Sequence, residues 1–234
     1  MFRMGRFGRN VLSNSGANAI HAAMQLGLIC LLFDWLNDAD YAAFLMAGYL
    51  IGLLEISSDY GGRLWATRKF AVTKTPSLVM RQSFSLKIAY TLAGVAILAF
   101  LPFATLSLPA LGLCVLIGFT QPGTDPYLWQ LRGRERLDIE AGAVLASRVA
   151  IAVAMVIAAA LNGGLLLLLT IWLAGNVLRM LGVKLRVSPV DGTDDGKAPE
   201  PPSGSDGVRR VIMDVFPLGT ALVLTCVFLS LIHI

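Results

Sequence analysis

The sequence predicts an all-α membrane protein: a polytopic helical bundle with a six-helix N-terminal lobe and part of a seventh span. Two observations carry this prediction. Hydrophobic residues make up 56% of the 234 residues and charged residues only 15%, whereas soluble domains carry about 25% charged residues. Apolar segments also recur along the chain at the length of a membrane-spanning helix, which is about 20 residues.

Each of seven apolar segments is close to that length. We expect helices, because an isolated strand would leave its backbone groups unpaired in lipid and the segments lack the alternation of a barrel strand. The fourth segment contains Pro122 and Pro126, where the helix should bend or end. The expected spans are residues 16–34, 41–60, 86–105, 108–128, 141–161, 163–182 and 212–232.

The basic residues fall on alternate sides of these spans. The N-terminal segment and the second, fourth and sixth connections hold every lysine and arginine except Arg148. The first connection instead carries Asp34, Asp38 and Asp40. The positive-inside rule therefore predicts a multi-pass protein with a cytoplasmic N-terminus. The net charge of +4 is then explained by the basic residues of the cytoplasmic connections, and no nucleic-acid partner is expected.

Composition divides the chain into three parts. Residues 1–186 form the expected six-helix lobe. Residues 187–210 are rich in Pro, Gly, Ser and Asp and have no apolar period, which predicts a flexible cytoplasmic linker. Residues 211–234 would begin a second lobe. Because the last apolar run ends without a polar flank, where a helix would leave its carbonyls unpaired in lipid, we expect the chain to be C-terminally truncated.

No catalytic or metal-binding motif is evident. The sequence contains no GxxxxGK[ST], HExxH or GxSxG pattern. Its three cysteines lie in apolar runs without metal-ligand spacing, and it has only two histidines. We therefore expect neither an enzyme nor a cofactor.

Polar residues inside the spans are the candidate functional residues, because burying them in a membrane is costly. Arg148 lies about 10 Å inside the fifth span, and Glu55 lies at a similar depth in the second. Glu55 shares a helix face with Asp59, as His21 does with Gln25. Simpler roles stay open: snorkelling for Arg148, an interfacial position for Glu55, a helix cap for Asp59, and packing for His21 and Gln25. The functional interpretation places Arg148 in a hydrated cavity, facing an acidic partner or an anionic substrate.

Three stretches resemble one family. PYLWQLRGRERLDIEAGAVLASR is similar to the connection between spans four and five of bacterial polysaccharide flippases. These are the O-antigen and exopolysaccharide (Wzx-like) transporters of the multidrug/oligosaccharidyl-lipid/polysaccharide superfamily. YLIGLLEISSDYGGRLWATRKFA and GRNVLSNSGANAIHAAMQLGL are similar to the family's second and first spans, so the resemblance covers residues 8–185. The residues that carry it in the first stretch are Pro126, Trp129, Gln130, Gly133, Glu135, Arg136 and Arg148.

The resemblance implies a transporter of the bacterial cytoplasmic (inner) membrane that serves polysaccharide and lipopolysaccharide O-antigen synthesis. Two six-helix lobes would alternate between inward-open and outward-open states. The implied substrate is a lipid-linked oligosaccharide of the undecaprenyl-pyrophosphate type, and the implied partners are membrane lipids and the polysaccharide polymerase machinery. Arg148 would bind the pyrophosphate, and Glu55 would pair with Arg148 in the empty state or respond to a coupling ion. The expected substrate pathway comprises His21, Gln25, Glu55, Asp59, Gln130 and Arg148.

Three alternatives remain. An ion-coupled multidrug exporter of the same superfamily would use acidic residues such as Glu55 and Asp59 without a basic partner, and Arg148 argues against it. A membrane-embedded enzyme of envelope synthesis would need an Asp or His cluster with metal spacing. The outer aspartates at 34, 38 and 40 have no His or Lys nearby. A structural or regulatory membrane protein that does not transport is the third alternative.

Overall fold

The protein is described by a computed structural model that covers residues 6–73, 75–98, 106–187, 213 and 215–216. Within these residues the chain forms seven α-helices and no strand, so the all-helical prediction is confirmed. The helices are α1 (Arg6–Trp35), α2 (Asp38–Asp59), α3 (Gly62–Val72), α4 (Pro76–Leu98), α5 (Leu108–Gly133), α6 (Leu137–Ala160) and α7 (Leu165–Arg186).

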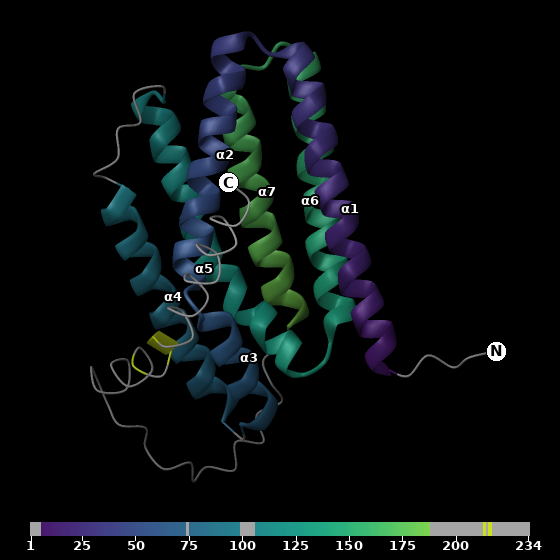
Figure 1. Ribbon diagram of the computed structural model, residues 1–234, viewed down its shortest axis with the longest axis vertical. Coiled ribbons are helices and arrows are strands. Elements are labelled where there is room, and N and C mark those ends of the chain that lie inside the picture. Colours follow the sequence, from purple (N-terminus) through teal and green to yellow (C-terminus); the bar gives the residue numbers. More distant parts are fainter. Residues whose placement is uncertain (1–5, 74, 99–105, 188–212, 214, 217–234) are drawn as a thin grey trace, which may run out of the picture.

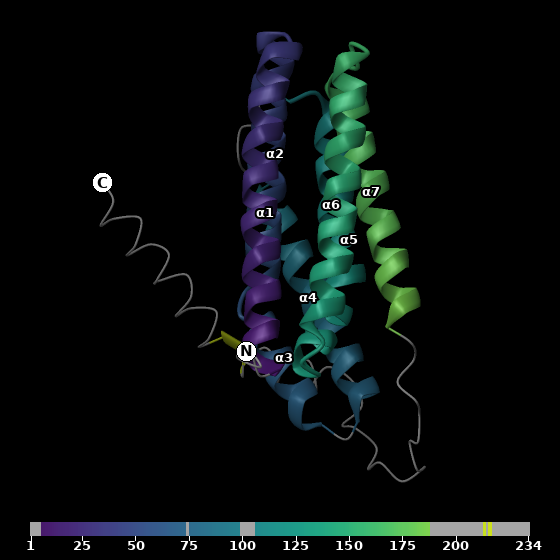
Figure 2. The same ribbon diagram turned by 90° about the vertical axis from the view of Figure 1, so that its right-hand side faces the viewer.

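The long helices run side by side along one axis, and the short α3 lies at one end of the bundle (Figure 1). Helix α1 packs mainly on α6, α7 packs on α5 and α6, and α2 packs on α4 and α5. Helices α1 and α2 make few contacts with each other, because they diverge from the turn that joins them (Figure 1). Figure 2 shows α1 and α2 on one side of the bundle and α6 and α7 on the other.

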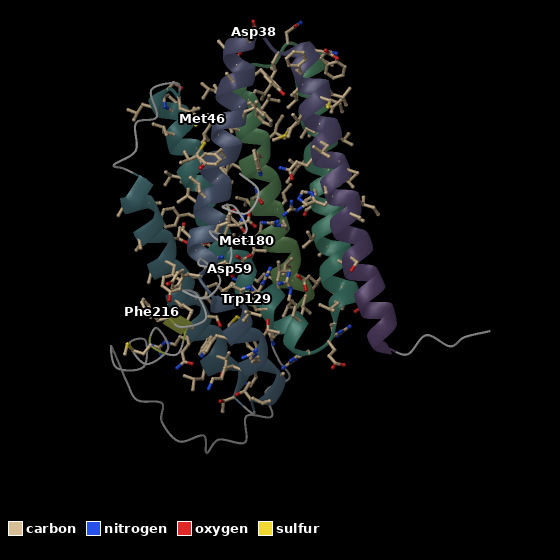
Figure 3. All side chains as sticks on the ribbon, viewed as in Figure 1. Asp38, Met46, Asp59, Trp129, Met180 and Phe216 are labelled. Carbon is tan, nitrogen blue, oxygen red and sulfur yellow. The ribbon has the colours of Figure 1, made fainter. Side chains whose placement is uncertain are left out.

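The two ends of the bundle differ in charge. The α1–α2 turn carries the aspartates at 34, 38 and 40 and is called the acidic end below. Helix α3 and the α5–α6 turn lie at the opposite end and carry exposed Arg63, Arg68, Lys69, Arg134 and Arg136, so this end is called the basic end. Figure 3 shows Asp38 at the acidic end and Trp129 toward the basic end. This separation agrees with the charge pattern expected of a membrane protein.

Three local features stabilise the turn at the acidic end. The Asn37 side chain accepts a hydrogen bond of 2.8 Å from the backbone N–H of Asp40 and caps α2. Asp38 and Asp40 lie in the first turn of α2, where their charge is favourable to the helix dipole. Phe33 and Tyr41 meet edge to face across the turn, with ring centroids 5.2 Å apart.

Apolar packing is concentrated toward the acidic end. Leucines, isoleucines and methionine from five helices bury almost all of their surface there. They include Leu32 of α1, Leu50 and Leu54 of α2, Ile117 of α5, Met155 of α6 and Leu168 of α7. Toward the basic end the interior holds polar side chains, among them Lys87, Gln121, Thr124, Glu140 and Arg179. Two smaller apolar clusters lie there as well, one that includes Trp65, Phe70 and Trp129 and one of Leu128, Leu131 and Val183. The main apolar core therefore gives way to a mixed polar and apolar interior partway along the bundle.

The outer surface has the character expected of contact with lipid. Large apolar side chains are exposed on several helices, for example Leu26 at 65%, Ile157 at 55% and Leu178 at 68%. Three of the described helices, α2, α6 and α7, are long and apolar enough to cross a membrane, and α1 contributes a shorter apolar stretch at Ala19–Trp35. Within the described residues, α4 and α5 are not among these helices, and they carry the interior charges of Lys87 and Asp125.

The structure corrects the expected helix boundaries. The second connection contains a helix, α3, that was not expected, and α4 begins at Pro76 instead of near residue 86. Helix α5 does not end near Pro122 or Pro126 but continues to Gly133. Both prolines are buried, and α5 packs on α4 and α7, so tertiary packing outweighs the lost backbone hydrogen bonds. The seventh span at 212–232 and the linker at 187–210 lie almost entirely outside the described residues.

Close packing of α3 on the end of α5 depends on Gly133. A Cβ atom at Gly133 would lie 2.6 Å from the Cβ of Phe70 and 2.8 Å from the carbonyl oxygen of Thr67. We expect Gly133→Ala to destabilise the protein by about 1–3 kcal/mol, because α3 must move away. Thermal unfolding of the purified protein in detergent measures this change.

Gly142→Ala is the matched control, because a Cβ at Gly142 of α6 meets no atom within 4 Å. Its melting temperature should equal or exceed that of the wild type, since alanine favours a helix by about 1 kcal/mol over glycine. Equal melting temperatures for both variants would contradict the close contact between α3 and α5.

Candidate functional site

Two adjoining cavities lie where the apolar core ends. The larger, of about 600 Å³, is lined by α1, α2, α5, α6 and α7. The smaller, of about 460 Å³, extends toward the basic end and also involves α3 and α4. The residues that line both are His21, Glu55, Gln121, Arg148 and Arg179. These side chains form the polar boundary between the two cavities and are called the junction below.

The larger cavity is amphipathic. Phe44, Ile51, Met155 and Trp172 form an apolar wall that continues into the core. The polar side chains of the lining are those of the junction together with Gln25 of α1, Tyr49 of α2 and Asn176 of α7. A ligand in this space would therefore meet hydrocarbon and aromatic surface on one side and charged groups on the other.

Arg148 of α6 points into the junction and contacts the imidazole of His21 on α1. A guanidinium can only donate hydrogen bonds, so a neutral ring nitrogen of His21 accepts this one. Among the described residues no carboxylate lies within 4 Å of the Arg148 guanidinium. Its Nε is buried and has no hydrogen-bond partner among those residues. Arg148 is thus held in the bundle by a neutral group.

Arg179 of α7 reaches the same junction. Its residue exposure is only 8%, and its Nη2 donates to Oε1 of Gln121 on α5 over 3.3 Å. Its Nε is also buried and without a hydrogen-bond partner among the described residues. The charge of Arg179 acts on both Arg148 and His21, so the three groups are electrostatically close. Two guanidinium groups thus share one junction.

Glu55 of α2 is the acidic residue of the junction. It lines both cavities, and its charge acts favourably on Arg148. It forms no ion pair within 4 Å among the described residues. Glu55 therefore balances part of the positive charge at a distance without occupying a hydrogen-bond donor of either arginine.

The other charges of the smaller cavity pair with one another. The Nζ of Lys87 lies 2.6 Å from Oδ2 of Asp125, and 5.5 Å from the ring centre of Trp129. The Lys87 side chain is fully buried and that of Asp125 is 17% exposed. This pair connects α4 to α5 and neutralises both charges.

Two further pairs close the smaller cavity. Nε of Arg132 donates to both carboxylate oxygens of Glu140, over 2.7 and 2.9 Å, and Nη2 contacts the same carboxylate. Burial alone would lower the pKa of Arg132, but the hydrogen bond and charge of Glu140 raise that pKa above its usual value. Arg63 lies 3.7 Å from Asp59. Asp59, Asp125 and Glu140 are thus each paired with a cation of their own. The two arginines of the junction therefore outweigh its one carboxylate, Glu55.

The structure brings most of the predicted site residues together. His21, Gln25, Glu55 and Arg148 line the larger cavity. Asp59 lines only the smaller cavity. Gln130 lines neither of the two: it is 2% exposed in α5, and its backbone carbonyl accepts from the N–H of Arg134 over 3.1 Å.

Sequence reasoning missed Arg179, Gln121 and Lys87 as interior residues. Arg179 and Lys87 were assigned to cytoplasmic connections, whereas they lie inside α7 and α4. A sequence signal for Arg179 existed, since Asn176 and Arg179 are three residues apart and share one face of a helix. No group of three His, Cys, Asp or Glu side chains in the described part of the chain could hold a metal ion.

The buried pair of Lys87 and Asp125 gives a stability prediction. Asp125→Asn leaves the Lys87 charge buried without compensation, so we expect a loss of about 3–5 kcal/mol. Thermal unfolding in detergent measures it. Asp59→Asn is the control, because its partner Arg63 has a side chain that is 51% exposed, and such pairs contribute about 0–1 kcal/mol.

A double variant tests the cause. Lys87→Met with Asp125→Leu removes both charges and should recover most of the stability lost in Asp125→Asn. Failure of the double variant to recover any stability would contradict the view that an unpaired Lys87 charge is the source of the loss.

No family model, curated protein or solved structure matches this chain. The junction itself supplies the chemistry: two arginines, oriented by neutral groups, that face a cavity.

Proposed function

We propose that this protein is part of a membrane transporter that moves a lipid-linked oligosaccharide across the bacterial cytoplasmic membrane by alternating access. The observation that carries the proposal is the presence of Arg148 and Arg179 in one junction without a carboxylate partner within 4 Å among the described residues. Arg179 is buried and Arg148 is half-buried, and a charge withdrawn from water without a partner is costly. An anion that binds there would gain the interaction that the protein itself does not supply.

The geometry favours a phosphate-containing anion. Guanidinium groups bind phosphate oxygens through two parallel hydrogen bonds and stay charged at any physiological pH. Two arginines on different helices, α6 and α7, could each bind one phosphate of a diphosphate. The Nε atoms of both arginines are buried and have no hydrogen-bond partner among the described residues, so those residues do not saturate the donors of either guanidinium.

The amphipathic cavity supports a lipid-linked substrate. Its volume of about 600 Å³ lies within the range of small-molecule sites, about 300–1,000 Å³. Its polar side chains suit a sugar diphosphate, and its apolar wall suits an attached lipid. The sequence resemblance adds the expectation of a second lobe, which would close the cavity from the other side.

The ion-coupled multidrug exporter is the weaker alternative. A cationic drug would need a negatively charged site, and Glu55 is the one junction carboxylate against Arg148 and Arg179. The enzyme alternative lacks a metal-binding cluster among the described residues.

Substitution of the two arginines tests the proposal. The full chain in detergent should bind a polyprenyl-diphosphate-linked oligosaccharide, as measured by native mass spectrometry. Arg148→Ala and Arg179→Ala should each weaken binding by about ten- to a hundredfold, since a hydrogen bond to a charged group contributes about 1.5–3 kcal/mol. Arg134→Ala, in the exposed α5–α6 turn, is the control and should bind like the wild type. Equal binding by all three variants would refute the proposal.

Membrane orientation gives a separate prediction. We expect the basic end to face the cytoplasm and the acidic end to face the outside. In a variant whose cysteines at 30, 114 and 226 are replaced by alanine, Asp38→Cys should react with a membrane-impermeant maleimide in intact cells. Arg134→Cys should react only after the cells are opened. The reverse labelling pattern would invert the proposed topology.

A further inference from the structure

His21 occupies an unusual electrostatic position. It lies on α1 and contacts the Arg148 guanidinium of α6, while Arg179 of α7 acts on it electrostatically as well. Glu55 of α2 and Gln121 of α5 complete the junction around it. Among the described residues no carboxylate lies within 4 Å of the imidazole. A titratable group is therefore placed beside two permanent cations.

In the empty junction this position favours neutral imidazole. Protonation of the ring nitrogen that accepts from Arg148 would remove that hydrogen bond, because imidazolium has no acceptor. It would also put a third positive charge beside Arg148 and Arg179. Glu55 offsets only part of this charge. The other carboxylates of the smaller cavity, Asp59, Asp125 and Glu140, are near their own cations Arg63, Lys87 and Arg132.

A bound dianion reverses this balance. Two negative charges between the arginines draw the Arg148 guanidinium toward the ligand and release the imidazole from its role as acceptor. Protonated His21 then supplies one more N–H donor to the anion, and the added positive charge is attracted instead of repelled. Occupation of the junction by an anion and protonation of His21 therefore favour each other.

We propose that His21 makes anion binding proton-linked: each diphosphate ligand that binds at Arg148 and Arg179 is accompanied by one proton, taken from water onto the imidazole of His21. No bond of the ligand forms or breaks in this step. The inference rests on the proposed function and deepens it, because it identifies the proton as the ion that binds together with the substrate. By reciprocity, the ligand must bind more tightly as the proton concentration rises.

The test uses a ligand whose own charge does not change. A P1,P2-dialkyl diphosphate carries two negative charges throughout the range from about pH 8 to about pH 5.5, which brackets histidine titration. Its affinity for the full chain in detergent is measured by isothermal titration calorimetry. We expect the affinity to rise as pH falls, by at most about tenfold per pH unit for one linked proton. At neutral pH, the observed heat should differ between two buffers of different ionisation enthalpy, which shows proton uptake directly.

Two histidine variants identify the residue that takes up the proton. His21→Gln keeps a side-chain acceptor for Arg148 but cannot titrate, so it should still bind the ligand, with an affinity that no longer depends on pH. His233→Gln replaces the only other histidine in the sequence and should keep the pH dependence of the wild type.

The outcomes separate this inference from the proposed function. Binding by the wild type with no pH dependence and no proton uptake would overturn the role of His21 but leave the anion site intact. A pH dependence that persists in His21→Gln would also overturn it, by assigning the proton to another group. Absence of binding by the wild type at every pH would overturn both proposals.

Discussion

Compensation of buried charge is the constraint on which the interior of this protein depends. Lys87 is fully buried and is tolerated because Asp125 lies 2.6 Å away. Arg132 is tolerated because Glu140 binds it through two oxygens. These pairs connect α4 to α5 and α5 to α6, so charge neutralisation and helix packing specify the same arrangement. The same requirement makes the junction exceptional, since Arg148 and Arg179 lie in the same interior without such partners.

The position of the junction follows from the distribution of apolar residues. Toward the acidic end, close packing of side chains such as Leu32, Ile117 and Leu168 leaves little space. Toward the basic end, ion pairs and long polar side chains lie between smaller apolar clusters, so the interior is less uniformly packed. The cavities lie between these two regions, where α1 has already diverged from α2 (Figure 1). A cavity at the boundary between these two regions has apolar side chains on one side and charged side chains on the other. No local sequence motif is needed to produce this arrangement.

The sequence predicted the helical class and the alternation of charge between the two ends, and it singled out Arg148, Glu55 and His21, which the structure places around the same two cavities. It did not predict that His21 would be the partner of Arg148, because that contact joins residues 127 positions apart and depends on α1 packing against α6. Hydropathy also misplaced Arg179, since charges near a span end are usually assigned to loops. The course of α5 through two prolines could not be anticipated either, because burial against α4 and α7 decides it.

Neutral groups hold both arginines of the junction, and this has a consequence for ligand binding. A carboxylate in contact with Arg148 would orient the guanidinium but would also compete with any anion for its charge. His21 and Gln121 orient the arginines through hydrogen bonds alone, so the positive charge stays available to a ligand. Glu55 is near enough to act on Arg148 yet makes no ion pair within 4 Å among the described residues. The proposed anion would therefore not have to displace an acidic residue of the site, and its release would accompany loss of the proton from His21, which restores the acceptor for Arg148.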